Sequence, residues 1–262
     1  MSRFRLGMTL ESLNQPLRTA VVTIAQAGIT ALVFDAIGPL GPASLGETAR
    51  REVRHLLQSH LITPTALRCP LRHGLEELDG LEQRLDRLRQ AMQLSFDLGA
   101  RLILLGIGPV PEKQDDLRRQ RMKIALHELA HYGDRVGCRI ALDAGSEPIE
   151  TLLGFIREID TASLGVSIDP AAFLLEKLPV ESTVLAAKGL IAHSFARDMI
   201  PRRLDRPARE VRLGEGDVDL ITWLACLEAA GYDGSLTIRQ PISAQPVEDA
   251  RQAVALLRRL GA

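Results

Sequence analysis

The strongest constraint on the fold is a regular alternation of short apolar runs with longer amphipathic stretches along the whole chain. Eight apolar runs have the length of buried strands: Phe4–Thr9, Ala31–Ala36, Thr63–Cys69, Leu102–Ile107, Arg139–Asp143, Leu164–Asp169, Leu190–Phe195 and Gly234–Arg239. Helical periodicity marks eight further segments: Leu17–Ala27, Gly46–Ser59, Leu81–Leu98, Leu117–Val136, Ile149–Ile159, Pro179–Ala187, Asp219–Ala230 and Val247–Leu260. This pattern predicts an α/β fold, a single (β/α)8 TIM barrel that spans residues 1–262 as one domain.

The alternative is a doubly wound open sheet. That fold binds dinucleotides through a Gly-x-Gly-x-x-Gly turn after its first strand, and no such turn follows the first strand here. The chain shows no domain linker and no low-complexity stretch. Its one shift in composition is Met199–Arg212, which holds five arginines and two prolines. We predict an inserted loop at this point, after the seventh strand.

Charge and cysteine content exclude several classes of protein. Lys plus Arg (32) nearly cancel Asp plus Glu (33), so nothing attracts nucleic acid or an anionic membrane. No apolar run approaches the length of a membrane span, and the N-terminus lacks the apolar core of a signal peptide. Cys69, Cys138 and Cys226 are an odd number and widely spaced, which argues against a disulfide framework or a zinc knuckle. We therefore expect a cytoplasmic protein with no nucleic-acid or membrane partner.

One motif suggests zinc, but its helical geometry argues against a catalytic site. His127-Glu-Leu-Ala-His131 matches the His-Glu-x-x-His pattern of zinc proteases. Leu126 and Leu129 belong to the apolar stripe of the same helix. At about 100° per residue, both histidines lie roughly 160° from Leu129. We predict that they face solvent outside the barrel; an adventitious surface metal site is the alternative.

Charged residues gather where the predicted strands end. In an α/β barrel, the carboxyl ends of the strands and the loops that follow them meet at one mouth. We therefore expect a single charged cluster there. Its candidate members are Asp35, Arg68, Asp143, Glu147, Asp169, His193, Arg197, Asp198 and Arg239.

Several segments resemble one family, the xylose-isomerase-like sugar isomerases and epimerases. The resemblance implies a TIM barrel and a divalent metal that is held by four side chains and steadies an enediolate. It covers nearly the whole barrel. The segments are Ile140-Ala-Leu-Asp-Ala-Gly-Ser-Glu-Pro148, Leu164-Gly-Val-Ser-Ile-Asp-Pro170, Ile191-Ala-His-Ser-Phe-Ala-Arg-Asp198, Leu213-Gly-Glu-Gly-Asp-Val-Asp219 and Gly231-Tyr-Asp-Gly234.

The chain departs from the family at the metal ligands that the resemblance implies. Asp169 matches a family Asp ligand, and Asp143 stands in place of a Glu. Phe195 stands in place of the His ligand and Arg239 in place of the second Glu. A divalent ion such as Mn²⁺ or Mg²⁺ needs several oxygen or imidazole ligands, which this set does not supply. We therefore predict no metal and no other cofactor.

Arg239 has a proposed role at the old metal position. We hypothesise that its guanidinium is an internal counter-ion that pairs with Asp143 or Asp169. The alternatives are that Arg239 binds an anionic or polyhydroxy ligand, or that it faces solvent. Any catalytic role would fall to these three residues, with an aspartate as base and Arg239 as electrostatic stabiliser.

The other candidates are predicted to bind substrate or to shape the mouth. His193 is expected to be buried and hydrogen-bonded in the barrel wall, with general acid–base catalysis as the alternative. Arg197 and Asp198 are expected to form a salt bridge that orients the seventh loop. Asp35 and Arg68 either line the pocket or cap loops, and the arginine-rich loop is either solvated or presents cations to a ligand. Glu147 follows the fifth strand and completes the set.

These observations predict a divergent barrel that has lost its metal site. We expect it to bind a small polar or anionic, sugar-like molecule with little or no isomerase activity. The alternative is a metal-independent isomerase or epimerase that uses Asp143 or Asp169 as base. An endonuclease for abasic DNA would need a multi-zinc cluster and a basic face, which the sequence lacks. A homo-oligomer is left open.

Overall fold

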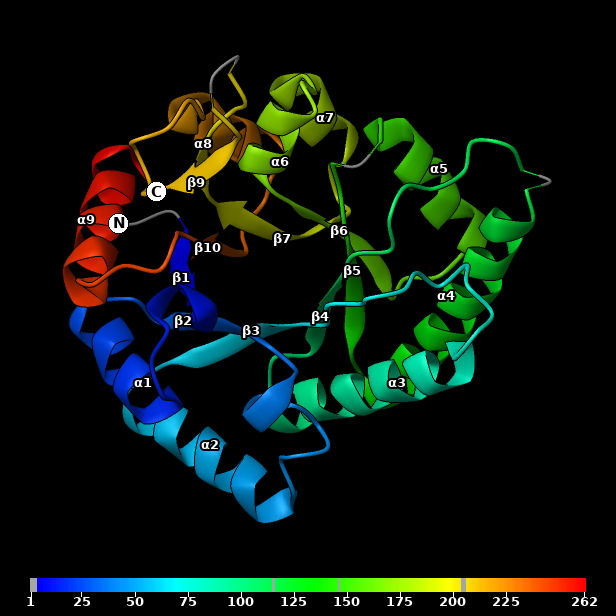
Figure 1. Ribbon diagram of the computed structural model, residues 1–262, viewed down its shortest axis with the longest axis horizontal. Helices are drawn as coiled ribbons and strands as arrows, with labels where there is room; N and C mark the ends of the chain where they lie inside the picture. The colour runs from blue at the N-terminus through cyan, green and yellow to red at the C-terminus, as the bar shows by residue number, and fades with distance from the viewer. Residues whose placement is uncertain (1–3, 115, 146, 204–205) are drawn as a thin grey trace.

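Eight parallel strands close into a barrel that is surrounded by helices (Figure 1). The computed structural model describes residues 4–262 except residues 115, 146 and 204–205. Each barrel strand pairs with its neighbour, and β1 pairs with β10 to close the barrel. The predicted (β/α)8 barrel is confirmed. The strands are β1 (Arg5–Thr9), β2 (Ala31–Asp35), β3 (Thr63–Arg68), β4 (Leu102–Leu105), β5 (Arg139–Asp143), β6 (Leu164–Ile168), β7 (Ile191–Ala196) and β10 (Ser235–Ile238).

The outer helices lie where the sequence predicts them, to within one or two residues at each end. They are α1 (Leu17–Gln26), α2 (Glu47–Ser59), α3 (Leu81–Leu98), α4 (Leu117–Val136), α5 (Ile149–Ile159), α7 (Val180–Ala186), α8 (Leu220–Ala229) and α9 (Pro246–Arg259). None of the described helices is both long and apolar enough to cross a membrane.

Three short helices were not predicted: η1 (Leu10–Leu13), η2 (Gly38–Leu40) and α6 (Pro170–Leu175). The last of these has a clear local cause. The Asp169 side chain accepts a hydrogen bond from the Ala171 amide at 2.9 Å, and Pro170 occupies the first helical position. Asp169 is thus both an N-cap and a residue of the barrel mouth. A helix of six residues is too short to leave a clear periodic pattern in the sequence.

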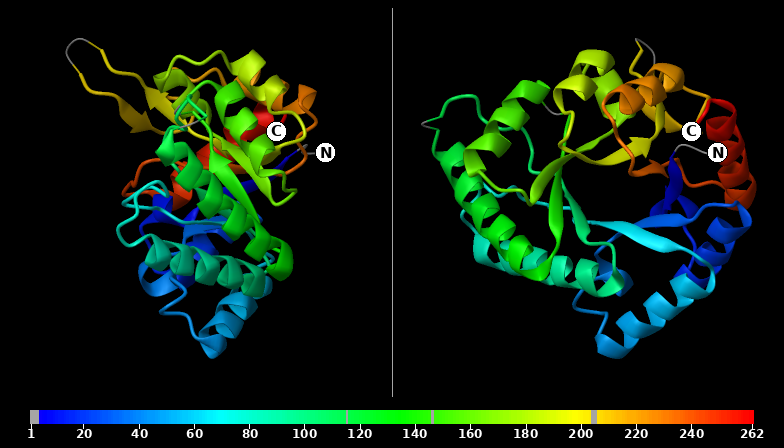
Figure 2. Two further views of the ribbon diagram at one scale, coloured as in Figure 1. Left: turned by 90° about the vertical axis from the view of Figure 1, so that its right-hand side faces the viewer. Right: turned by 180° about the vertical axis from the view of Figure 1, so that it is seen from behind.

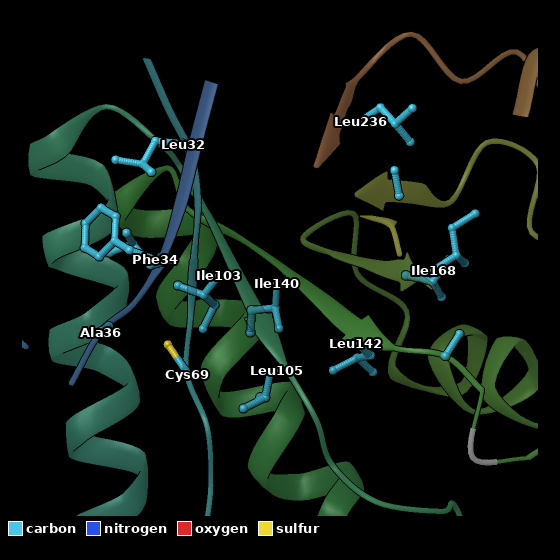
Figure 3. Close-up of a cluster of buried hydrophobic side chains, with 14 of the residues drawn as sticks. Leu32, Phe34, Ala36, Cys69, Ile103, Leu105, Ile140, Leu142, Ile168 and Leu236 are labelled. Atoms are coloured by element: carbon cyan, nitrogen blue, oxygen red, sulfur yellow. The ribbon is translucent and has the colours of Figure 1, made fainter. Parts of the chain in front are cut away.

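Alternation along the strands divides the buried apolar side chains between a layer outside the barrel and a smaller cluster inside it. In β2, Leu32 and Phe34 belong to the layer between the barrel and the helices, whereas Val33 belongs to the inner cluster. In β5, Leu142 points into the outer layer and Ala141 into the inner one. Figure 3 shows part of the outer layer, where these leucines and Phe34 lie beside helices. Period-2 alternation therefore leaves the last inward residues of the strands free to form the mouth.

The segment after β7 corrects one prediction. Met199–Arg212 was expected to be an inserted loop, but its ends pair as an antiparallel hairpin of β8 (Asp198–Ile200) and β9 (Arg209–Val211). Leu204 and Asp205, within the expected loop, lie outside the described residues. The hairpin projects away from the barrel, as the left view of Figure 2 shows. Two strands of three residues give too little alternation to be recognised among arginines and prolines.

The histidines of the His-Glu-x-x-His motif face solvent, as predicted. His127 and His131 are exposed on α4, whereas Leu126 and Leu129 are fully buried against the barrel. The motif therefore lies on the outer face of a helix, away from the mouth.

Two glycines provide a matched test of barrel packing. A Cβ at Gly165 in β6 would lie 2.8 Å from the Leu190 carbonyl oxygen and 3.0 Å from Ala192 Cβ, whereas a Cβ at Gly154 in α5 would meet nothing within 4 Å. We expect Gly165→Ala to lower the free energy of unfolding by about 1–3 kcal/mol. Gly154→Ala is expected to raise it by about 0.5–1 kcal/mol through helix propensity. Urea unfolding of both variants measures the difference, and equal stabilities would contradict it.

Candidate functional site

A polar pocket of about 390 Å³ opens at the carboxyl ends of the barrel strands. It joins the ends of β3, β5, β6, β7 and β10 with one side of α6. Its lining residues are Arg68, Asp143, Ala144, Gly145, Ser167, Asp169, Ala172, Leu175, Glu176, Phe195, Arg197 and Arg239. Of the residues predicted from the sequence, it brings together Asp143, Asp169, Arg239, Arg68 and Arg197.

Asp143 is the acid with the most perturbed environment in this pocket. It ends β5, and one carboxylate oxygen lies 3.3 Å from where a Cβ at Gly106 would be. Asp143 is exposed to solvent at the mouth, although protein atoms lie close around its carboxylate. The resulting desolvation raises the pKa of Asp143 to about 6; the Arg68 charge opposes this shift, and the nearby Asp169 charge adds to it. Asp143 therefore changes charge close to neutral pH.

Asp169 is held by an arginine of the next strand end. Arg197 Nη1 lies 3.0 Å from Asp169 Oδ2, and Arg197 Nε donates to Glu210 Oε1 at 2.8 Å. Arg197 thus joins the barrel mouth to the hairpin through two carboxylates. Both contacts are partly shielded from solvent, so they are stronger than exposed ion pairs.

The hypothesis for Arg239 is wrong in its choice of partner. Arg239 lies in the pocket, but its ion pair within 4 Å is with Glu210, at 3.5 Å from Nε to Oε1, and not with Asp143 or Asp169. Arg197 occupies Asp169 instead. The hairpin folds back and brings Glu210 between the two arginines. The sequence interpretation missed Glu210 because it treated this segment as a loop.

Arg239 is also surrounded by like charge. Its pKa is lowered by burial and by the neighbouring guanidiniums of Arg197 and Arg68, although Glu210 and Asp169 oppose the shift. Three arginines therefore share one small pocket, and acidic residues around them balance much of the charge.

Arg68 is positioned by acids that lie beside the pocket. Arg68 Nη1 lies 3.2 Å from Asp35 Oδ1, at the ends of neighbouring strands. The Asp35 amide in turn donates to Glu11 Oε1 at 2.6 Å. Asp35 is not among the lining residues and contacts Arg68, which does line the pocket, so a direct contact of Asp35 with a ligand stays a prediction. Glu11, whose pKa is raised mainly by burial, was not predicted because it lies in a short helix and not at a strand end.

His193 is buried in the barrel wall, as the leading interpretation predicted. Its Nδ1 is hydrogen-bonded to Ser167 Oγ at 3.3 Å and its Nε2 to Thr237 Oγ1 at 2.9 Å. Burial lowers the pKa of His193 to about 3, and the Arg68 charge contributes, so the ring is neutral at physiological pH. It is not among the residues that line the pocket, and its selection as a substrate-binding residue stays a prediction.

Asp198 has a structural role that differs from its predicted one. It forms no ion pair with Arg197; its buried carboxylate accepts hydrogen bonds from the amides of Met199, Gly214 and Gly216 at 2.9 Å and of Val218 at 3.1 Å. A Cβ at Gly216 would lie 2.1 Å from Asp198 Oδ1. The Gly-Glu-Gly-Asp-Val segment is therefore a loop that wraps around one carboxylate, and Asp198 does not contact the pocket.

Glu147 also lies outside the pocket. Both of its carboxylate oxygens are shielded from solvent, in the region of Val110 on the preceding loop. Burial raises the pKa of Glu147 to about 7, and the Val110 amide opposes this by less. Glu147 is not among the residues that line the pocket, and its role as a substrate-binding residue stays a prediction.

The residues at the family's metal positions do not fit a divalent cation. Asp143 and Asp169 offer two carboxylates, of which Asp169 already binds Arg197. Phe195 supplies no donor atom, and Arg239 supplies a positive charge where a ligand would be needed. In the part of the chain that the structure describes, no three His, Cys, Asp or Glu side chains are grouped to hold a metal.

Comparison with known proteins identifies the family. The family model of the xylose isomerase-like TIM barrel matches residues 21–260. The chain belongs to this family. An uncharacterised protein of Methanocaldococcus jannaschii, MJ1311, is 25% identical over 171 residues, which cover 58% of this chain and 54% of that protein. The match thus spans about half the length of this curated relative.

Solved structures of sugar-converting enzymes share the fold. A xylose isomerase domain protein from Planctomyces limnophilus has a TM-score of 0.84 at 20% identity, with 99% of this chain and 97% of that chain covered. D-allulose 3-epimerase from Methylomonas sp. has a TM-score of 0.79 at 17% identity, with 99% and 98% covered. A 3-keto-D-glucoside 4-epimerase from E. coli has a TM-score of 0.79 at 15% identity, with 98% and 99% covered. The xylose isomerase-like barrel is therefore related in fold to sugar epimerases and isomerases.

The role of Asp198 leads to a stability prediction. We expect Asp198→Asn to lower the free energy of unfolding by about 3 kcal/mol. The asparagine side chain keeps one oxygen, which is a weaker acceptor than a carboxylate, and its NH2 group would face backbone N–H donors. The control is Asp217→Asn, since Asp217 is in the same loop but its contact with Arg203, at 3.4 Å, is exposed. That variant should lose less than about 1 kcal/mol. Similar losses in the two variants, measured by urea unfolding, would contradict the anchoring role.

The environment of Asp143 predicts its titration. Carboxyl carbon NMR should show one aspartate with a midpoint near pH 6, absent in Asp143→Asn. Because the folded pKa is raised above the ordinary value of 3.8, this group stabilises the fold as pH falls from about 7 towards 4. Asp143→Asn should therefore gain more stability, relative to the wild type, at pH 8 than at pH 4. A midpoint near the ordinary value would contradict the burial argument.

Proposed function

We propose that the protein is a ligand-binding barrel of the xylose isomerase-like family that works without a divalent metal. It binds a small polar or anionic, sugar-like molecule and has little or no isomerase activity. The observation that carries the proposal is the ion pair between Asp169 and Arg197, together with the arginine at position 239. Asp169, the one residue that matches a metal ligand of the family, is thus engaged by a cation. At the position of a second ligand stands Arg239, which is itself a cation.

The size and lining of the pocket support a small polar ligand. A volume of about 390 Å³ lies at the lower end of the range for small-molecule sites. Carboxylates and guanidiniums both line it, and such groups bind hydroxyls by accepting and donating hydrogen bonds. Ala172 and Leu175 of α6 supply an apolar side. The names of the structural neighbours, which include epimerases of D-allulose and of a 3-keto-D-glucoside, favour a sugar-like molecule.

The pKa of Asp143 favours a second candidate, a metal-independent isomerase or epimerase. A carboxylate with a pKa of about 6 is a better general base at neutral pH than an ordinary aspartate. Arg239 would then stabilise the anionic intermediate. The second acid argues against turnover, since Asp169 Oδ2 lies 3.0 Å from Arg197 Nη1 and is engaged by that contact. Binding is therefore the function that we favour.

The proposal predicts binding that does not depend on metal. After dialysis against EDTA, calorimetry with a panel of monosaccharides and sugar acids should give the same dissociation constants with and without added Mn²⁺. Elemental analysis of protein purified from cells that were grown with excess manganese should find less than one metal ion per chain. Tight Mn²⁺ binding that is required for ligand binding would overturn the proposal.

Exchange with solvent separates the two candidates. A bound ketose that is incubated in D2O should show no enzyme-dependent deuterium uptake beside its carbonyl if the barrel only binds. Uptake that is lost in Asp143→Asn, while ligand affinity is kept, would favour the metal-independent isomerase instead.

A further inference from the structure

The arrangement of charge in the pocket indicates which class of small molecule it recognises. Arg68, Arg197 and Arg239 all line the pocket, although they come from three different strand ends. Like charges in a confined site repel, and the lowered pKa of Arg239 reflects this repulsion together with burial. The arrangement therefore needs anions between the guanidiniums.

Protein carboxylates meet this need unequally. Arg197 has two close partners, Asp169 at 3.0 Å and Glu210 at 2.8 Å. Arg68 has Asp35 at 3.2 Å through one terminal nitrogen. Among the described residues, Arg239 has only the more distant Glu210, at 3.5 Å and through Nε. Arg239, which the family resemblance places at a metal-ligand position, is thus the arginine with the weakest protein counter-ion.

Arg239 is open to the pocket and has a weak contact with acid. In the described part of the chain, its shortest contact with an acidic residue is the 3.5 Å from Nε to Glu210 Oε1, and its side chain is 30% exposed in the pocket. The two terminal nitrogens of a guanidinium form a fork that matches the two oxygens of a carboxylate or phosphate. A hydroxyl group occupies only one arm of this fork and brings no charge.

We propose that the ligand of this pocket is a sugar acid or sugar phosphate whose anionic group binds the terminal nitrogens of Arg239, beside Arg68 and Arg197. This inference rests on the proposed function and specifies its ligand class. The rest of the molecule is a polyol of monosaccharide size, because the cavity of about 390 Å³ leaves little room for more. Its hydroxyls lie within reach of the pocket acids, including Asp143 and Glu176.

Glu210 both positions Arg197 and Arg239 and competes with an anionic ligand for their charge. It holds Arg239 and Arg197 side by side, but as an anion it also satisfies part of the charge that a ligand would meet. Removal of its charge and of the Arg239 charge should therefore change anion affinity in opposite directions. A purely structural salt bridge would not produce this pattern.

The experiment compares matched anionic and neutral ligands by calorimetry at constant ionic strength. D-glucuronate and D-glucose differ at one carbon, and glucose 6-phosphate and inorganic phosphate separate a sugar phosphate from a free anion. We expect the preferred sugar anion to bind at least about tenfold more tightly than glucose. Arg239→Gln should weaken the affinity for that anion by about tenfold or more and change the affinity for glucose by less than about threefold. Glu210→Gln should raise the affinity for the anion and leave the affinity for glucose unchanged.

The control variant is Arg202→Gln, an exposed arginine at the hairpin, which should change neither affinity. If the pocket variants do not fold, added NaCl with the wild-type protein is the test: it should weaken anion binding and leave glucose binding unchanged. Glucose that binds as tightly as both glucuronate and glucose 6-phosphate, or an Arg239→Gln variant that binds the preferred anion normally, would overturn the inference but leave the proposed function in place. Failure of every probe to bind would overturn the proposed function itself.

Discussion

The ion pairs of Glu210 hold the candidate site together. One carboxylate oxygen lies 2.8 Å from Arg197 and 3.5 Å from Arg239, so it offsets the repulsion between two cations that come from neighbouring strands. The hairpin of β8 and β9 contributes to the site through Glu210, an acid of β9 that contacts these two arginines at the mouth. Without that acid, the buried Arg197 would depend on Asp169 alone, and Arg239 would have no anion within 4 Å among the described residues.

The proposed function implies that a barrel can change its chemistry while it keeps its shape. At the positions that the family resemblance assigns to metal ligands, guanidiniums and carboxylates contact each other, as Arg197 does with Asp169. On our proposal, cations that the chain carries itself stand where the family binds an exchangeable one. Such a change would alter what the pocket can do: a metal activates oxygen atoms as a Lewis acid, whereas arginine recognises anions by charge and shape.

The sequence predicted the barrel well because the barrel depends on periodicity. Helices such as α3 and α4 have long apolar stripes, and the strands are continuous apolar runs, so both signals extend over many residues. Asp143, Asp169, Arg68, Arg197 and Arg239 were also found at the mouth, because strand ends converge in any such barrel. Pairing was less predictable. The direction of a side chain after a strand ends depends on loop geometry. For this reason Glu147 and Asp198 are not among the lining residues, whereas Glu210, which no motif indicated, contacts two arginines of the pocket.

Asp198 and the loop around it separate the scaffold from the reactive centre. A Cβ at Gly216 would lie 2.1 Å from Asp198 Oδ1, and Gly214 donates its amide to the same carboxylate from a backbone with a φ of +92°. Neither requirement depends on what the pocket binds. Residues at the mouth can therefore change while this loop keeps its form.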